Sequence, residues 1–164
     1  MVMTEMVQSS AAQLPSSLEE IRALLAEIPD PEIPVITIEE LGILRRVDRD
    51  GGRIVVTITP TYSGCPAMEM ICGQIIDTLA ANGIEDAQVK TVYSPAWTTD
   101  WMSEAAKAKL DAYGVAPPGS REAVLCPRCR SNDVRTVSSF GSTACKALMV
   151  CQACLEPFDW FKAI

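Results

Sequence analysis

The sequence of 164 residues contains no histidine. Histidine is the commonest general base at neutral pH and the commonest nitrogen ligand for metal ions. Its absence excludes catalytic pairs of the Cys–His and Ser–His kind. Any chemistry that this chain performs must therefore use thiols, carboxylates or a bound metal ion.

Long apolar runs are also missing. No stretch reaches the roughly eighteen apolar residues of a membrane-spanning helix, and residues 1–13 lack the basic region and apolar segment of a secretory signal. The sequence has no phosphate-binding loop, no dinucleotide-binding glycine pattern and no internal repeat. Together with cysteines that we expect to be unpaired, these absences predict a cytoplasmic protein without membrane contact.

Positive charge is scarce in the larger part of the chain. Residues 1–120 carry 8 Lys and Arg against 17 Asp and Glu, whereas residues 121–164 carry 6 against 4. Nonspecific binding to nucleic acid depends on neutralising phosphates. The net charge of −7 therefore argues against a nucleic-acid partner.

What the chain does contain is two Cys-x-x-Cys pairs near its end, separated by 21 residues. This spacing is typical of tetrahedral thiolate ligation, most often of zinc, on a small antiparallel ribbon. The same four thiolates could hold an iron–sulfur cluster, and a disulfide framework is a third interpretation. The predicted ligands are Cys126, Cys129, Cys151 and Cys154.

A fifth thiol lies between the pairs. Cys145 could replace one of the four ligands, or it could bind a cluster in transit. Basic residues near the pairs could offset the charge of four thiolates, and we expect Arg128, Arg130 and Lys146 to lie around the site.

Hydrophobic spacing and turn residues divide the rest of the chain into helices and strands. They predict an α+β fold, in which an α-ββ-α-β-α domain precedes the four-cysteine ribbon. Residues 1–14 are expected to be disordered, 15–114 to form the α+β domain, 115–125 to be a linker and 126–164 to be the metal module. The expected elements are helices over about 16–28, 66–81 and 99–113, a hairpin over 47–59 and a strand over 87–93.

Cys65 stands where a strand ends and a helix begins, directly before Pro66. Unpaired N–H groups at a helix N-terminus favour a thiolate over a thiol. A thiol of low pKa in this place is suited to holding a soft metal or a persulfide. An inert, half-buried side chain is the alternative for Cys65.

The sequence contains three further segments of note, which are Asp30-Pro31-Glu32, Gly64-Cys65-Pro66 and the stretch from Trp97 to Ser103. These segments resemble a family of iron–sulfur cluster assembly proteins, which includes the accessory protein T of the bacterial SUF system and cytosolic targeting factors of eukaryotes. The resemblance covers about residues 16–114. Within the metal module, residues 140–147 and 156–162 resemble the ribbon of the phenylacetate-degradation protein D family.

The resemblance implies a role in maturation of a phenylacetyl-CoA epoxidase system. Such a protein would insert an iron–sulfur cluster into the reductase or support metal loading of the oxygenase, without being the catalytic oxygenase itself. Cys65 matches the functional cysteine of the family, and Asp30 and Glu32 match its acidic motif. The two carboxylates could equally cap a turn.

Large aromatic residues near a reactive loop are typical partner anchors, so we expect Tyr93, Trp97 and Trp101 to contact the oxygenase or its reductase. An electron-transfer subunit with a cluster in the tail is the main functional alternative. A zinc-ribbon module that binds nucleic acid or protein is a third. The sequence leaves open the client, and whether Cys65 acts alone or across a homodimer.

Overall fold

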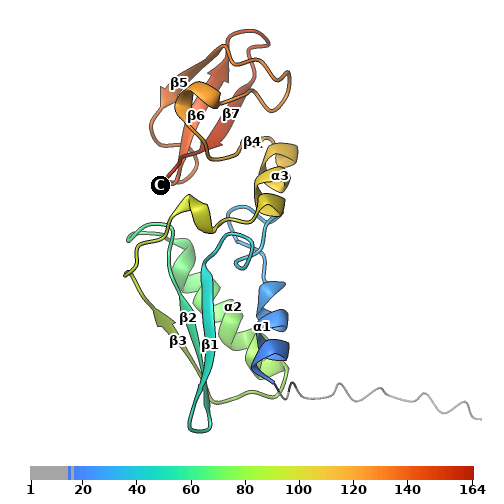
Figure 1. The fold of residues 1–164 in the computed structure, drawn as a ribbon, viewed down its shortest axis with the longest axis vertical. Helices are drawn as coiled ribbons and strands as arrows, with labels where there is room; N and C mark the ends of the chain where they lie inside the picture. The colour runs from blue at the N-terminus through green and yellow to red at the C-terminus, as the bar shows by residue number, and fades with distance from the viewer. Residues whose placement is uncertain (1–14, 16) are drawn as a thin grey trace, which may run out of the picture.

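Two β-sheets, one beyond the other along the molecule, organise the chain (Figure 1). The computed structural model describes residue 15 and residues 17–164, so the expected disorder of residues 1–14 lies outside the described part. We call residues 18–113 the first module and residues 115–164 the ribbon. No helix among the described residues is long and apolar enough to cross a membrane.

The first sheet has the order β1-β2-β3. Strands β1 (Leu44–Asp50) and β2 (Arg53–Ile58) form the expected antiparallel hairpin, with Gly51 at φ +61° in its turn. Strand β3 (Ala87–Thr91) pairs in parallel with β2, because helix α2 (Ala67–Ala81) carries the chain back between them. A hairpin and a crossover thus share one sheet.

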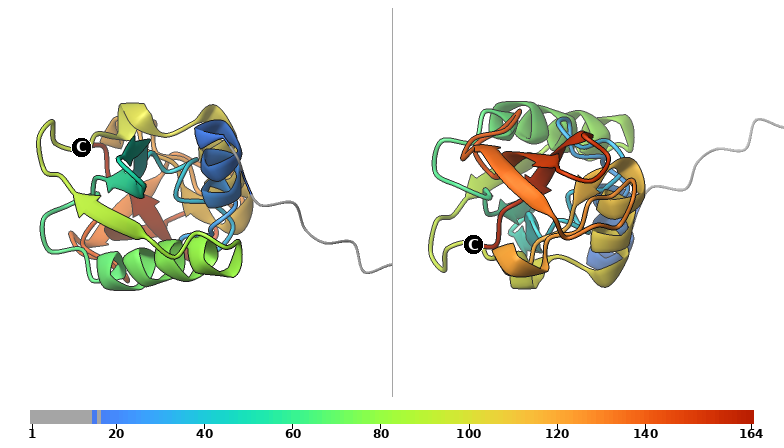
Figure 2. Two further views of the ribbon diagram at one scale, coloured as in Figure 1. Left: turned by 90° about the horizontal axis from the view of Figure 1, so that it is seen from below. Right: turned by 90° about the horizontal axis from the view of Figure 1, so that it is seen from above.

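Helix α1 (Leu18–Ala26) begins at a capping box. The Ser17 hydroxyl accepts the N–H of Glu20 at 3.1 Å, and the Glu20 carboxylate accepts the N–H of Ser17 at 3.0 Å. Helix α1 contacts β1 and α2, and α2 contacts β3 (Figure 2). The two helices therefore enclose the core of the first module against its sheet.

The helix expected over 99–113 is divided in two. A 3₁₀ turn, η1 (Thr99–Trp101), is followed by an extended residue, Met102, before helix α3 (Glu104–Tyr113) begins. Met102 is buried, and the hydroxyl of Ser103 caps α3 by accepting the N–H of Ala106 at 3.0 Å. The chain breaks here because an N-cap residue such as Ser103 takes extended, non-helical backbone angles.

The ribbon contains a four-stranded sheet of order β4-β7-β6-β5. Strands β5 (Val134–Ser138), β6 (Lys146–Cys151) and β7 (Pro157–Phe161) are antiparallel neighbours. Strand β4 (Val115–Ala116), which lies within the segment 115–125, pairs in parallel with β7. A second 3₁₀ turn, η2 (Arg121–Ala123), leads to the first cysteine pair.

The two sheets share a hydrophobic core. Phe161 and Cys145 of the ribbon, both buried, belong to the same cluster as the side chains between α1, α2 and the first sheet. The ring of Phe161 lies 6.0 Å from that of Trp97. The ribbon stands on the end of the first module (Figures 1 and 2).

Candidate metal centre and neighbouring thiol site

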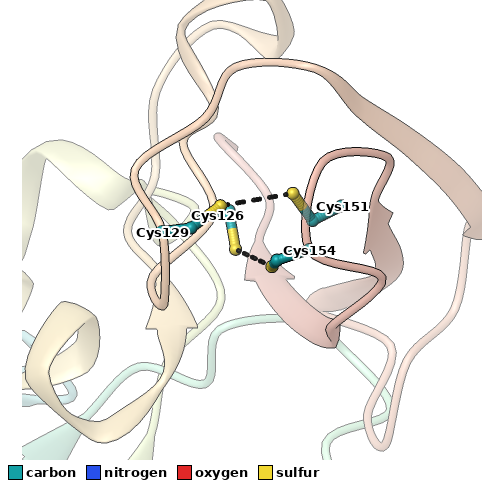
Figure 3. A group of neighbouring side chains, drawn as sticks. All are labelled: Cys126, Cys129, Cys151 and Cys154. Atoms are coloured by element: carbon teal, nitrogen blue, oxygen red, sulfur yellow. Dashed lines mark hydrogen bonds between the residues drawn. The ribbon is translucent and has the colours of Figure 1, made fainter.

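The thiols of the two Cys-x-x-Cys pairs meet in one place (Figure 3), where all four sulfur atoms lie within 4.8 Å of one another. The sulfur of Cys126 lies 3.7 Å from that of Cys154, and the sulfur of Cys129 lies 3.5 Å from that of Cys151. A disulfide requires about 2.0 Å between sulfurs. A tetrahedron of zinc–sulfur bonds of about 2.3 Å places them about 3.8 Å apart. The arrangement therefore fits a tetrahedral zinc ion.

Both pairs lie in the same kind of backbone turn. The N–H of Arg130 donates to the carbonyl of Cys126 at 2.9 Å, and the N–H of Leu155 donates to the carbonyl of Cys151 at 3.0 Å. Arg130 and Leu155 have φ values of 65° and 63°. Residues other than glycine rarely adopt this left-handed conformation. The unfavourable conformation allows each turn to aim two sulfurs at one point.

The surroundings of the thiols change their pKa values. Backbone N–H groups, that of Cys154 first, lower the pKa of Cys151 to about 7. The N–H of Glu156 lowers the pKa of Cys154. Lost hydration and the neighbouring thiols raise it by more, so that the net pKa is about 12. Four sulfurs in so small a volume cannot all ionise without a cation between them, and a divalent metal would supply that charge.

Of the cations expected around this centre, Arg128 is the one that acts on its thiols. Glu156, at 2.6 Å, and then Cys154 and Cys126 raise the pKa of the Arg128 guanidinium. Arg130 instead forms two bonds of 2.7 Å with Asp111. The expectation is wrong for Lys146, which is buried beside an acidic loop of the first module.

That loop holds the two carboxylates singled out in the sequence. Oδ1 of Asp30 accepts the N–H groups of Glu32 at 3.0 Å and Ile33 at 2.8 Å, and only 4% of Asp30 is exposed. Burial raises the pKa of Asp30. Burial and then the charge of Asp30 raise the pKa of Glu32. Asp30 thus caps its own turn, while being a buried acid of the kind that gathers at functional sites.

Replacing Asp30 with asparagine is expected to leave the protein at least as stable as the wild type at neutral pH. The amide oxygen can accept the same two N–H groups, and the cost of burying a charge disappears. Because the folded-state pKa of Asp30 is raised, the wild type loses stability as the pH rises through the unfolded and then the folded pKa, and the variant does not. Urea unfolding at several pH values from about 4 to about 8 should show that the free energy of unfolding of the variant, relative to that of the wild type, increases with pH. A variant less stable at every pH would mean that the carboxylate is a net stabilising partner of Lys146.

Cys65 lies at the start of α2, half-buried against the first core. Burial raises its pKa, the N–H of Ala67 lowers it, and the charge of Glu32 raises it again. The net pKa is above the ordinary value, so the expectation of a low pKa is wrong. Burial and the neighbouring carboxylate outweigh the helix N-terminus.

The ribbon reaches this part of the first module. Cys145 is 5% exposed, and its sulfur lies 2.9 Å from the hydroxyl of Thr143. It belongs to the first core and not to the four-thiol group. The structure therefore separates Cys145 from the ligands that it was expected to be able to replace.

The aromatic residues expected to contact partners have different environments. Trp97 is 3% exposed, and its Nε1 donates to the carbonyl of Leu41 at 3.0 Å, so its expected docking role is corrected to a core role. Trp101 is partly exposed, and the guanidinium of Arg45 lies over its ring, 3.6 Å from the ring centre. Tyr93, 60% exposed, is available to a partner.

The sequence interpretation did not single out Tyr62, and it expected Lys146 beside the four-thiol centre instead. Burial raises the pKa of Tyr62, and the backbone of Ala144, in the ribbon, lowers it. Lys146, 4% exposed, lies 3.6 Å from Asp159, and its charge lowers the pKa of Asp30. The buried residues that alternate along β6 are Ala147, Met149 and Cys151, so this pattern would place Lys146 on the outer face, and nothing in the spacing pointed to its burial or its partners.

Comparison with known proteins divides the chain in the same way. Residues 18–92 match the family described as iron-sulfur cluster assembly protein, and residues 111–162 match the PaaD zinc beta ribbon domain. A domain of unknown function from Bacillus anthracis has a crystal structure similar to this one, with a TM-score of 0.52 and 31% identity, covering 57% of this chain and 90% of that one.

Two curated relatives extend the comparison. The Fe-S protein maturation auxiliary factor YitW of Bacillus subtilis is 37% identical over 94 residues, covering 56% of this chain and 91% of that protein. A protein of Escherichia coli, provisionally named as the D component of 1,2-phenylacetyl-CoA epoxidase, is 48% identical over 165 residues, covering 96% of this chain and 100% of the relative. Since this match spans both modules, the chain belongs to the family of the 1,2-phenylacetyl-CoA epoxidase D component.

Proposed function

We propose that the protein is an accessory factor that assists the insertion of an iron–sulfur cluster into the reductase, or the metal loading of the oxygenase, of a phenylacetyl-CoA epoxidase system. The names of its relatives support both halves of the proposal. The Bacillus subtilis relative is named as a maturation factor, and the Escherichia coli relative is named as an epoxidase component.

The observation that carries the proposal is the position of Cys65. It lies in the part of the chain that resembles maturation factors, residues 18–92, at the start of a helix and beside Glu32. A thiolate is a soft ligand that suits iron–sulfur clusters. The raised pKa keeps Cys65 protonated and unreactive until a metal displaces the proton.

The four-thiol centre has a different part in this proposal. We assign Cys126, Cys129, Cys151 and Cys154 as ligands of a structural zinc ion. Four protein thiolates complete a tetrahedron and leave no position for a substrate or a water molecule. A saturated centre of this kind stabilises the ribbon, while the cargo is held elsewhere.

Replacing Cys65 with serine is expected to abolish maturation without unfolding the protein. Serine is nearly isosteric, so the thermal midpoint should change by only about a few degrees, or about 1 kcal/mol or less. In cells that carry the variant as their only copy, the iron and acid-labile sulfide of the purified reductase, or the iron of the purified oxygenase, should fall several-fold. These contents are the measurement.

Cys72→Ser is the matched control, because Cys72 is another half-buried free thiol, with its neighbour Thr91 in β3 and away from the acidic loop. It should leave cluster content unchanged. A reductase and an oxygenase that are both fully loaded in Cys65→Ser cells would refute the proposal and make Cys65 a packing residue.

A further inference from the structure

Helix α2 has an apolar solvent side that no other described segment covers. Met70 is 57% exposed and Ile76 is 37% exposed. In both views of Figure 2 the helix, drawn in green, lies at the edge of the molecule, with no other segment beyond it. We define the α2 outer face by six exposed residues on this side of the helix, which are Glu69, Met70, Gly73, Ile76, Asp77 and Ala80.

Helix α1 provides a comparison within the same module. It exposes Glu19, Glu20 and Ala23. It buries Ile21 and Leu25. Charged residues on the solvent side are typical of a surface helix, whereas a helix that is apolar on all sides is normally buried. The α2 outer face therefore has the composition of a surface that another molecule covers.

Gly73 lies in the middle of the α2 outer face, and the fold gives no reason for a glycine there. It is part of a regular helix, and a Cβ at this position would have no other part of the chain within 4 Å. Glycine in a helix interior is less favourable than alanine, because it loses more conformational freedom on folding. What glycine permits is the close approach of another backbone. The position therefore indicates that another chain packs against α2 at Gly73.

The charged side chains of the α2 outer face are all negative. Glu69 and Asp77 are exposed, and α2 contains no lysine or arginine. Among the described residues, neither of these carboxylates forms an ion pair. Lys90 of the neighbouring β3 alternates with Val89, which packs against the core, so Lys90 points to the other side of the sheet. A partner that matches this face presents apolar residues bordered by lysine or arginine.

A second copy of this chain does not match the α2 outer face. Glu69 and Asp77 stand four residues to either side of Gly73. Two copies that packed together at Gly73 would bring acid against acid, whether their helices ran parallel or antiparallel. Like charges that meet across an interface oppose association. The occupant is therefore a different protein.

We infer that the α2 outer face is the docking surface for the client, and that it binds a client helix whose apolar stripe is bordered by lysine or arginine. The inference rests on the proposed function for the identity of the client, which is the reductase or the oxygenase. Cys65 directly precedes Pro66, the N-cap residue of α2, so a client on this face comes close to the thiol that the proposed function uses. The flexible side chain of Met70 can adapt to the shape of the partner.

Photo-crosslinking in cells that make the epoxidase system identifies what this face contacts. The crosslinker p-benzoylphenylalanine replaces Ile76 in the full chain. As a control it replaces Val137, which is 50% exposed on β5 of the ribbon. Mass spectrometry then identifies the adducts. We expect an adduct with the reductase or the oxygenase from position 76, and a weaker one or none from position 137.

A substitution at Gly73 tests the close approach. With the crosslinker at position 76, Gly73→Gln should remove the adduct, because a long side chain then stands where the partner backbone passes. The same variant should melt at or above the wild-type temperature, by up to about 2–4 degrees, since glutamine favours a helix over glycine. Ala108→Gln, on the exposed side of α3, is the matched control and should leave the adduct unchanged.

Charge reversal tests the partner's chemistry. Glu69→Lys combined with Asp77→Lys should lower the adduct yield roughly tenfold. Glu122→Lys combined with Asp133→Lys makes the same change of charge at exposed positions of the ribbon, and should leave the yield unchanged.

The outcomes separate this inference from the proposed function. An adduct with neither client at position 76, or one with a second copy of this chain, overturns the inference. An adduct that Gly73→Gln or the charge reversal leaves unchanged also overturns it, as does a Gly73→Gln variant that melts below the wild type. In each of these cases, lost cluster or metal content in Cys65→Ser cells leaves the proposed function standing. Normal content in those cells, with a client adduct that responds to both variants, refutes the maturation role and leaves the docking surface.

Discussion

Replacing Cys151 with serine is expected to remove zinc and unfold the ribbon. Cys151 is fully buried, and its sulfur lies 3.5 Å from that of Cys129. Structural zinc sites contribute about 10–16 kcal/mol in small peptides, which equals or exceeds the total stability of about 5–15 kcal/mol of a typical domain. A ribbon of about fifty residues cannot replace that contribution by burying apolar surface.

The effect should extend into the first module. Its core includes Phe161 and Cys145, and both lose their positions when the ribbon unfolds. We therefore expect the secondary structure of α1 and α2 to persist at room temperature, but with a thermal midpoint lower by roughly ten degrees or more. Zinc analysis and circular dichroism during heating are the measurements.

Cys72→Ser is the control for loss of a thiol that no metal requires. It should bind one zinc ion per chain and melt close to the wild type. One zinc ion per chain in Cys151→Ser, with an unchanged midpoint, would contradict the assignment of the ligands.

Replacing Trp97 with alanine is expected to cost about 3–5 kcal/mol of stability, the range for truncating a buried aromatic residue. The substitution leaves a cavity beside Phe161 and leaves the carbonyl of Leu41 without its donor. Urea unfolding should show a lower midpoint. The loss of packing is expected to be largest near the contact between the modules.

Tyr93→Ala provides the comparison on the surface, because Tyr93 is exposed. It should change stability by less than about 0.5 kcal/mol. A loss of under about 1 kcal/mol in Trp97→Ala, together with weaker binding to the oxygenase or reductase, would restore the docking role that burial argues against.

Local patterns were sufficient for most helices and strands. Ser17 with Glu20 begins α1, the Gly51 turn defines the hairpin and Gly114, at φ +95°, ends α3. These features depend on residues within a few positions of one another, so the sequence displays them directly. The four-cysteine centre could be predicted for the same reason, since the Cys-x-x-Cys spacing is itself the local structure.

Long-range contacts were not predictable in this way. The parallel pairing of β4 with β7, the contact of Trp97 with Phe161 and the burial of Cys145 in the core of the first module all join segments far apart in the chain. No spacing rule reveals which loop a buried thiol will face. The pKa of Cys65 was misjudged for the same reason, because its burial and the charge of Glu32 come from tertiary contacts.

The position of Phe161 also determines when the fold can be completed during synthesis of the chain. Residues leave the ribosome in order, at roughly 5–20 per second, and β7, which inserts between β4 and β6, is the last strand to appear. Until then, the space beside Trp97 stays open and β4 has no neighbour in its sheet. A chain broken off before Pro157 therefore carries a permanent apolar opening, by which chaperones and proteases can distinguish it from a finished protein.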